Sequence, residues 1–379
     1  MKQVIMKRIL LLLVFIPVLA LAEPMHSPTW GFFMDLPEGY AYTDGDALNQ
    51  FSFSGPEGLM FDVIVYNGHF SSLMELANDV NRRLSNRGEV DFFRYRNRQA
   101  AVFTLIFGDF LGWGIAVELD RHGNSNIQPM LLALSYGPSE KRHLELFHLS
   151  ALDSVAPSAQ DRLYPGLITE YSYPRGNAKS TPIAFAGLSA MIRENDAEAS
   201  QDFIEREFKV LLAYLNTTYL QAATIRYYRS IYRDSFDRIE DALNVVARHY
   251  GGHTASSNVQ RREFAQRVLT SIQNFSYERD LTGSDFLNLV SLVSEGSGSC
   301  DNRSLLYIMI LARANVRGAM MLSHYYSHAM ALLDLPGTGS RVGSHDVMWL
   351  VAETTDKIDI GLIAQEISDM QHWFAVVFD

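Results

Sequence analysis

The stretch SEGSGSCDNRSLLYIMILA, from Ser294 to Ala312, decides how the second half of this chain is organised. From residue 301 to residue 314 the stretch is apolar on nearly all sides, and a helix with that pattern is a buried one. Gly296 and Gly298 end the preceding apolar segment and let the backbone come close to the start of this helix. Cys300 therefore lies at the N-terminus of a predicted central, buried helix.

Cys300 is the single cysteine among 379 residues. A cysteine without an internal partner is a reactive thiol, one half of an intermolecular bridge, or an inert small hydrophobe in the core. The free amides and the dipole at a helix N-terminus favour the thiolate form of the cysteine. The charge of Asp301 acts in the opposite direction. We expect the effect of the helix N-terminus, together with a histidine partner, to outweigh that of Asp301. Cys300 would then be an unusually acidic thiol.

Two segments downstream of the helix are typical of strands, HAMALLDL over residues 328–335 and DVMWLVAE over residues 346–353. Glycines at 337, 339 and 343 lie between them, so the two segments form a predicted hairpin. In an antiparallel pair the opposed residue numbers have a constant sum, and a turn centred between Ser340 and Arg341 places His328 opposite Glu353. Directly opposed side chains lie about 5 Å apart at Cβ. The hairpin therefore brings a histidine and a carboxylate together, and a thiolate nucleophile needs a base and a group that orients that base.

These segments resemble the transglutaminase-like superfamily: GSGSCDNRSLLYIMILARANVRGAMM, then SHAMALL, then WLVAETT, preceded by IQNFSYERD at residues 272–280. The resemblance implies a papain-related domain with its core over residues 264–379. It implies Cys300 as nucleophile, His328 as base and Glu353 as orienting acid, with Asp356 as a second candidate for the acid. The implied activity is acyl transfer at an amide bond.

An acyl-transfer site needs donors for the oxyanion, and we expect the amide of Cys300 together with Gln273 or Tyr277. His324, His345 and Asp346 are the residues that suggest a metal, but they lack a firm ligand spacing. We therefore expect no metal and no cofactor. Water as the acyl acceptor would make the protein a peptidase or amidase, and an amine acceptor would make it a cross-linking enzyme. A non-catalytic peptide-binding or scaffolding protein that retains the fold is the alternative.

Residues 23–155 read as a separate α+β module of unknown role. Several short strands and two helices, one over residues 71–84 and one closing helix near residues 139–152, predict an antiparallel sheet with helices on one face. The opening strand and the break DLPEGY, residues 35–40, resemble those of the PsbP/Mog1-type sandwich. We interpret this unit as a binding or docking module, because no polar cluster in it is typical of catalysis.

Residues 156–185 are rich in proline and glycine with little periodicity, and are predicted to be a linker with few contacts across it. A helical segment follows from residue 186 and leads into the transglutaminase-like domain, which ends at residue 379. One of its helices contains RYYRSIYRD, residues 226–234, which mixes cations with aromatic rings. An amphipathic helix with snorkelling arginines explains this motif more simply than a ligand platform does.

The chain opens with a predicted secretory signal over residues 1–22: cations at 2, 7 and 8, an apolar run, and the cleavage pattern Ala20-Leu21-Ala22. An uncleaved N-terminal anchor is the alternative. We expect a periplasmic or secreted α+β protein with no membrane span after signal cleavage. The net charge of −11 argues against binding nucleic acid or an anionic membrane. The expected partner is a peptide or protein substrate, including those of the cell envelope.

Overall fold

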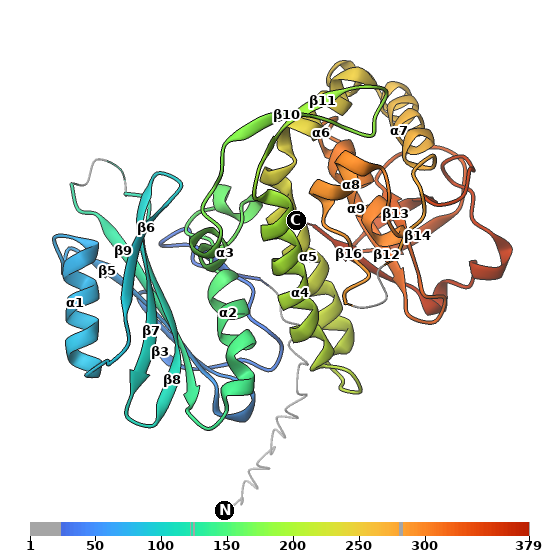
Figure 1. Cartoon of the computed structure of the whole chain (residues 1–379). Helices are drawn as coiled ribbons and strands as arrows, with labels where there is room; N and C mark the ends of the chain where they lie inside the picture. Colours follow the sequence, from blue (N-terminus) through green and yellow to red (C-terminus); the bar gives the residue numbers. More distant parts are fainter. Residues whose placement is uncertain (1–23, 122, 124–125, 280–282, 379) are drawn as a thin grey trace, which may run out of the picture.

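The computed structural model describes residues 24–121, 123, 126–279 and 283–378. It has the α+β fold that the sequence predicts, with a mixed unit on each side of two long central helices (Figure 1). The predicted signal, residues 1–22, lies outside the described residues. Within the ranges that are described, no helix is long and apolar enough to cross a membrane.

The N-terminal unit is built on a seven-stranded antiparallel sheet with the order β3-β4-β5-β9-β8-β7-β6. A short two-stranded pair, β1 (Met25–His26) with β2 (Phe33–Met34), precedes it. The strands of the large sheet are β3 (Ala41–Gly45), β4 (Gln50–Ser54), β5 (Met60–Asn67), β6 (Val90–Tyr95), β7 (Arg98–Phe107), β8 (Phe110–Glu118) and β9 (Pro129–Pro138).

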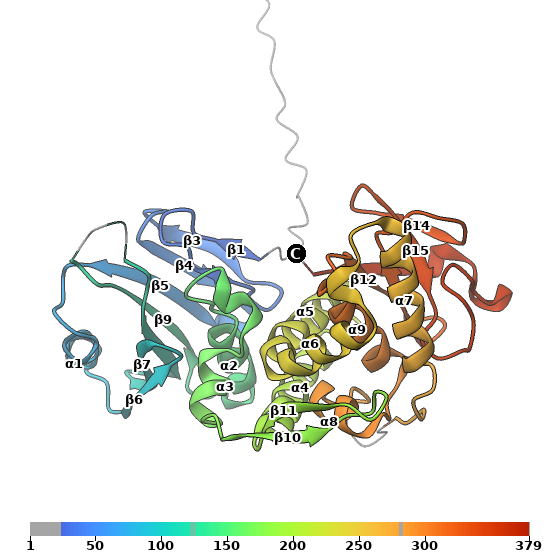
Figure 2. The same ribbon diagram turned by 90° about the horizontal axis from the view of Figure 1, so that it is seen from above.

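Helices cover both faces of this sheet, whereas the sequence analysis predicts helices on one face only. α1 (Leu73–Leu84), capped by the side chain of Ser72, packs on one face. α2 (Glu145–Asp153) and α3 (Leu167–Ser172) pack on the other (Figure 2). The reason lies in the central strands, because β7 and β9 carry runs of consecutive buried residues in place of an alternating pattern. Strands of this kind need a cover on each face.

The segment 156–185 packs against both units, so the prediction of a linker with few contacts is wrong. It contains η3 (Gln160–Leu163), α3 and β10 (Ala178–Pro182), and β10 forms a hairpin with β11 (Ser189–Arg193). Leu167 and Ile168 belong to the core of the N-terminal unit, and Ile183 and Phe185 belong to the core of the C-terminal unit. The apolar residues between the prolines fix this segment in place.

A buried polar interface joins the two units along α4 (Asp196–Leu212) and α5 (Leu220–Arg238). Arg226 of α5 pairs with Glu38 at 3.3 Å and with Glu207 at 3.0 Å, and each of these side chains is at most 3% exposed. The guanidinium of Arg233 donates to three backbone carbonyls, those of Asp153, Val155 and Tyr164. Buried charges whose partners lie in the other unit hold the two units together as one body.

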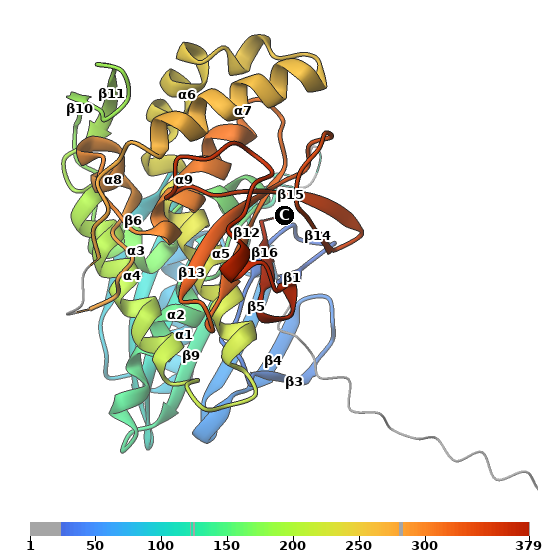
Figure 3. The same cartoon turned by 90° about the vertical axis from the view of Figure 1, so that its right-hand side faces the viewer.

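The C-terminal unit places one buried helix, α9, between other helices and a sheet (Figure 3). The helices are α6 (Glu240–His249), α7 (Asn258–Ile272), α8 (Leu289–Glu295) and α9 (Cys300–Ala312). The sheet has the order β14 (Arg341–Ser344), β15 (Val347–Ala352), β13 (His328–Leu333), β12 (Gly318–Ser323) and β16 (Phe374–Val377). The predicted central helix and the predicted strands downstream of it are therefore confirmed.

Candidate active site

The turn between α8 and α9 makes Cys300 the first residue of α9. α8 ends at Gly296, whose φ of 70° lies in the left-handed region that glycine adopts readily. The side chain of Asn302 then accepts hydrogen bonds from the N–H and the hydroxyl of Ser299, both at 2.8 Å. Ser299 and Asn302 thus form a capping box at the first turn of α9, which places Cys300 at the N-terminus of the helix, as the sequence predicts.

α9 is fixed by buried polar contacts as well as by apolar packing. Arg303, only 1% exposed, donates to the carbonyls of Phe275 at 2.9 Å and Gly298 at 3.1 Å. The hydroxyls of Ser304 and Thr354 are hydrogen-bonded at 3.0 Å, which ties the first turns of α9 to the segment that follows β15. The Cys300 end of the helix is thereby held beside the strand ends that carry the histidine and the acid.

His328 and Glu353 are in contact, as the hairpin predicts, with 2.7 Å between Nε2 and Oε2. The register is different, however, because β13 and β15 pair Ala331 with Ala352, and extending this register puts position 355 opposite His328. The difference arises because β14 makes its own hairpin with β15 inside the predicted loop. A shift of two residues keeps Glu353 on the same face of the sheet as His328. The two residues are then diagonal neighbours on adjacent strands, and the glutamate side chain is long enough to reach the histidine.

The contact with Glu353 sets the protonation of the histidine. Burial favours the neutral form of Glu353, but hydrogen bonds from His328 and Thr355 outweigh it and hold the pKa of this carboxyl below its ordinary value. A carboxylate can only accept, so in the neutral imidazole of His328 Nε2 carries the hydrogen and Nδ1 presents a lone pair. Burial alone would lower the pKa of His328, but the hydrogen bond and charge of Glu353 raise it above the ordinary value.

Cys300 is protonated in this arrangement, so the expectation of an unusually acidic thiol is wrong. Its side chain is buried, and the thiol donates to Oδ1 of Asp301 at 3.1 Å. The hydroxyl of Tyr228 donates to the same carboxylate. Burial and the Asp301 carboxylate raise the pKa of Cys300 well above that of an ordinary cysteine. Desolvation and the neighbouring charge therefore outweigh the helix N-terminus.

Two groups outside α9 interact electrostatically with the Cys300 thiol. The backbone N–H of Ala329, next to His328, acts to lower the pKa of the thiol. Burial raises the pKa of the Tyr277 phenol, and the charge of a Cys300 thiolate adds to this effect. Tyr277 is therefore a candidate donor to a group that reacts at Cys300.

Gln273 does not face the sulfur, so the prediction that it is an oxyanion donor is wrong. Its Nε2 donates to the carbonyl of Glu353 at 2.9 Å and to that of Ile358 at 2.8 Å, which uses both amide hydrogens. The side chain instead holds the backbone of Glu353 in position. Asp356, the second candidate for the acid, is exposed and acts on His328 through its charge.

Cys300 and His328 line one cavity of about 170 Å³. Tyr228 and Asp301 line it as well, and so do Arg279 and Asp285, which form an ion pair. His324 lines this cavity too, whereas His345 lines a different one, so the two histidines considered for a metal lie apart. Among the described residues, no group of three or more His, Cys, Asp or Glu side chains is placed to hold a metal ion.

Comparison with known proteins gives no family assignment. No family model matches the chain, and no curated protein matches it. A solved chain from Bacteroides thetaiotaomicron is 10% identical with a TM-score of 0.24, over 67% of this chain and 78% of that one. A solved chain from Cytophaga hutchinsonii, named "Putative Cysteine Protease", is 9% identical with a TM-score of 0.25, over 86% of this chain and 72% of that one. Likenesses at this level carry no argument for the activity.

The contact between Cys300 and Asp301 leads to a first prediction. Asp301→Asn should speed alkylation of Cys300 by iodoacetamide at pH 7 by about tenfold or more, because each unit by which the thiol pKa falls gives about ten times more thiolate. The rate follows from intact mass against time, with one thiol to observe. Asp285→Asn is the matched control, because Asp285 lines the same cavity but is paired with Arg279. An unchanged or slower rate in Asp301→Asn would contradict this assignment.

Proposed function

We propose that this protein is an exported, cysteine-dependent acyl-transfer enzyme that acts on amide bonds of peptides or proteins. Cys300 is the nucleophile, His328 the base and Glu353 the group that orients the base. The observation that carries the proposal is the 2.7 Å hydrogen bond from Nε2 of His328 to Glu353, on a histidine that shares its cavity with the single cysteine of the chain. Export rests on the sequence of residues 1–22.

The proposed reaction starts from the neutral thiol. The sulfur of Cys300 attacks the carbonyl carbon of the amide while its proton passes to Nδ1 of His328. Nδ1 is the ring nitrogen that is not hydrogen-bonded to Glu353. The negative charge on the carbonyl oxygen is stabilised by the N–H of Cys300 and the hydroxyl of Tyr277. The C–N bond then breaks, the imidazolium returns its proton to the leaving amine, and a thioester remains on Cys300.

The thioester is resolved by a second attack through the same groups. His328 takes a proton from water or from an acceptor amine, the oxygen or nitrogen bonds to the acyl carbon, and the sulfur leaves and recovers its proton. The cavity next to Cys300 is small, about 170 Å³, which suits a single side chain or backbone segment of a substrate. Most of a peptide would lie outside it, along the surface beside His324 and Ser327.

A non-catalytic peptide-binding or scaffolding role is the second candidate, and one observation favours it. Cys300 is buried, and its thiol is held in the neutral form by Asp301. An enzyme must move the thiol away from this carboxylate or transfer the proton to His328 when substrate binds. A binding protein needs neither event, and its ligand would occupy the cavity without chemistry.

A turnover assay separates the two candidates. The mature protein is incubated with a mixed-sequence library of peptides that release a fluorescent amine on cleavage, with and without hydroxylamine. Release that disappears in Cys300→Ala supports the enzyme, and hydroxamate products would show an acyl intermediate open to amine acceptors. Peptide binding without release, equal in wild type and Cys300→Ala, would favour the binding protein.

The pH dependence of turnover tests the role of Glu353. A protonated His328 cannot accept the thiol proton, so kcat/KM should fall as the pH drops through the pKa of His328, which lies above its ordinary value of 6.5. Glu353→Gln removes the charge that raises this pKa but leaves the burial, so the acidic limb should move to lower pH while the rate falls. Asp356→Asn, which removes a more distant charge, should move it less. An acidic limb below pH 6 in the wild type would contradict the pairing.

A further inference from the structure

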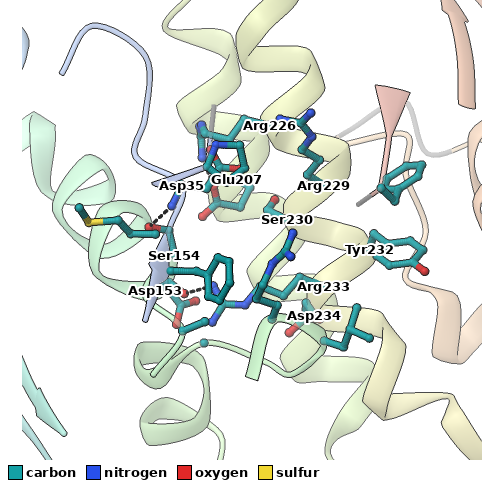
Figure 4. Close-up of a pocket in the computed structure, with 18 of the residues that line it drawn as sticks. Asp35, Asp153, Ser154, Glu207, Arg226, Arg229, Ser230, Tyr232, Arg233 and Asp234 are labelled. Atoms are coloured by element: carbon teal, nitrogen blue, oxygen red, sulfur yellow. Dashed lines mark hydrogen bonds and ion pairs between the residues drawn. The ribbon is translucent and has the colours of Figure 1, made fainter. Parts of the chain in front are cut away.

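A second cavity, of about 610 Å³, lies between the N-terminal unit and α5 (Figure 4). It is lined by β2 and the residue after it, the end of α2, the turn before α3, one side of α4 and α5, and Phe378. Small-molecule sites have volumes of about 300–1,000 Å³ and often lie between domains. α5 separates this cavity from that of Cys300. Thr224 and Tyr228 of α5 line the Cys300 cavity, whereas positions 226, 229, 230 and 233 line the larger cavity.

Part of the lining of this cavity consists of apolar side chains, several of them aromatic. The rings of Tyr232 and Phe378 are stacked, with centroids 4.6 Å apart. On the opposite side, the guanidinium of Arg162 lies over the ring of Phe33 at 4.7 Å, next to Met34. A flat apolar group entering between these walls would contact aromatic faces and edges.

Three arginines of α5 bring positive charge to the rest of the lining. Arg226 is 2% exposed, and within the described residues its Nη2 has no hydrogen-bond partner. Arg229, one turn later, donates from Nε to the carbonyl of Val377 at 3.2 Å, and no carboxylate in the described ranges lies within ion-pair distance of it. Arg233 donates to carbonyls. A buried guanidinium N–H without an acceptor is costly, so the cavity favours a ligand that supplies one.

Carboxylates in the lining restrict the charge of such a ligand. Asp153, Glu207 and Asp234 are each paired with an arginine at 3.0 Å or less. Asp35 is different, because its Oδ1 has no partner among the described residues, and burial raises the pKa of this carboxyl to about 6. These carboxylates repel a dianionic phosphate more strongly than a monoanion. The planar guanidinium group also matches a carboxylate in a two-pronged contact.

We propose that the cavity between the two units binds a small organic carboxylate with a ring-bearing apolar body, whose carboxylate accepts from Arg226 and Arg229. The apolar body lies against Phe33, Tyr232 and Phe378. This site is independent of the proposed chemistry at Cys300. It gives the motif RYYRSIYRD a ligand-binding function beyond that of an amphipathic helix.

Calorimetric titration of the mature protein with 4-phenylbutyrate tests the proposal. 4-Phenylbutanol, 4-phenylbutylamine and 4-phenylbutyl phosphate share the ring and chain and differ in the head group. Arg229→Gln removes one half-buried cation of the lining, Arg229→Lys keeps its charge, and Arg248→Gln removes an exposed arginine of α6 as the matched control. Far-ultraviolet circular dichroism of each variant reports folding.

We expect saturable binding of one 4-phenylbutyrate per chain and little binding of the alcohol or amine. Arg229→Gln should weaken the binding by about tenfold or more, since a hydrogen bond to a charged group has that effect. Arg229→Lys should restore part of the affinity, and Arg248→Gln should bind as wild type does. Absence of saturable binding, equal binding of the alcohol, tighter binding of the phosphate ester, or a folded Arg229→Gln with unchanged affinity would overturn the proposal. If Arg229→Gln does not fold, the head-group series on the wild type decides.

Discussion

His328→Ala is expected to lower kcat/KM for peptide amides by about 10²–10⁴-fold, with the protein still folded. The neutral thiol of Cys300 cannot attack an amide unless its proton leaves with the attack. In the proposed mechanism Nδ1 of His328 takes that proton, whereas the contact with Asp301 raises the pKa of the thiol. Loss of the imidazole also removes the acid that protonates the leaving amine.

His324→Ala is the matched control, because His324 lines the same cavity but does not contact Glu353. It should retain most of the activity. Initial rates for both variants at several pH values separate a lost base from a shifted pH optimum. A His328→Ala variant that keeps more than about a tenth of the wild-type rate would contradict its role as base, given that removing a general base costs about 10²–10⁴-fold.

Arg226→Met is expected to lower the free energy of unfolding by about 3–5 kcal/mol, because it leaves the carboxylate of Glu38 buried without its cation and removes one of the two arginines paired with Glu207. The three side chains come from both units, so the loss should lower the stability of the whole chain. Urea denaturation followed by circular dichroism and by tryptophan fluorescence measures it. In the wild type the two signals should change together.

Combining Arg226→Met with Glu38→Gln and Glu207→Gln should recover much of the loss, because neutral amides do not leave an uncompensated charge. Arg248→Gln, an exposed replacement, should change stability by no more than about 0.5 kcal/mol. If Arg226→Met costs no more than this control, the interface does not hold the two units together. The protein would then consist of two separable units, as the composition of residues 156–185 suggests.

The parts of the structure with a local sequence signal could be predicted. The apolar run after Cys300 predicts α9, the helix expected over residues 71–84 corresponds to α1, and the alternation of strands and glycines predicts β13 and β15. The predicted register of the hairpin differs from the observed one by two residues, because the sequence of β14 has no strong strand pattern and does not predict a strand. The pairing of His328 with Glu353 nevertheless survives, because an even shift preserves the face of the strand.

The parts that depend on distant residues could not be predicted. Arg226 and Glu38 are 188 positions apart, and charged residues of this kind are usually exposed. Tyr228 and Asp301 are 73 positions apart, so their contact, which affects the thiol, has no local signal. The helices on both faces of the N-terminal sheet did have a signal, because β7 and β9 read as continuous apolar runs and not as alternating ones.

Covalent labelling of Cys300 by a peptide chloromethyl ketone is the most direct test of the proposed cysteine chemistry. Intact mass gives the rate for wild type, His328→Ala and Cys300→Ala, with iodoacetamide as a reagent that lacks a peptide. The account predicts one adduct per wild-type chain, none in Cys300→Ala, and a rate at least about 100-fold lower in His328→Ala with the peptide reagent. Equal rates in wild type and His328→Ala, or no adduct on the wild type, would contradict it.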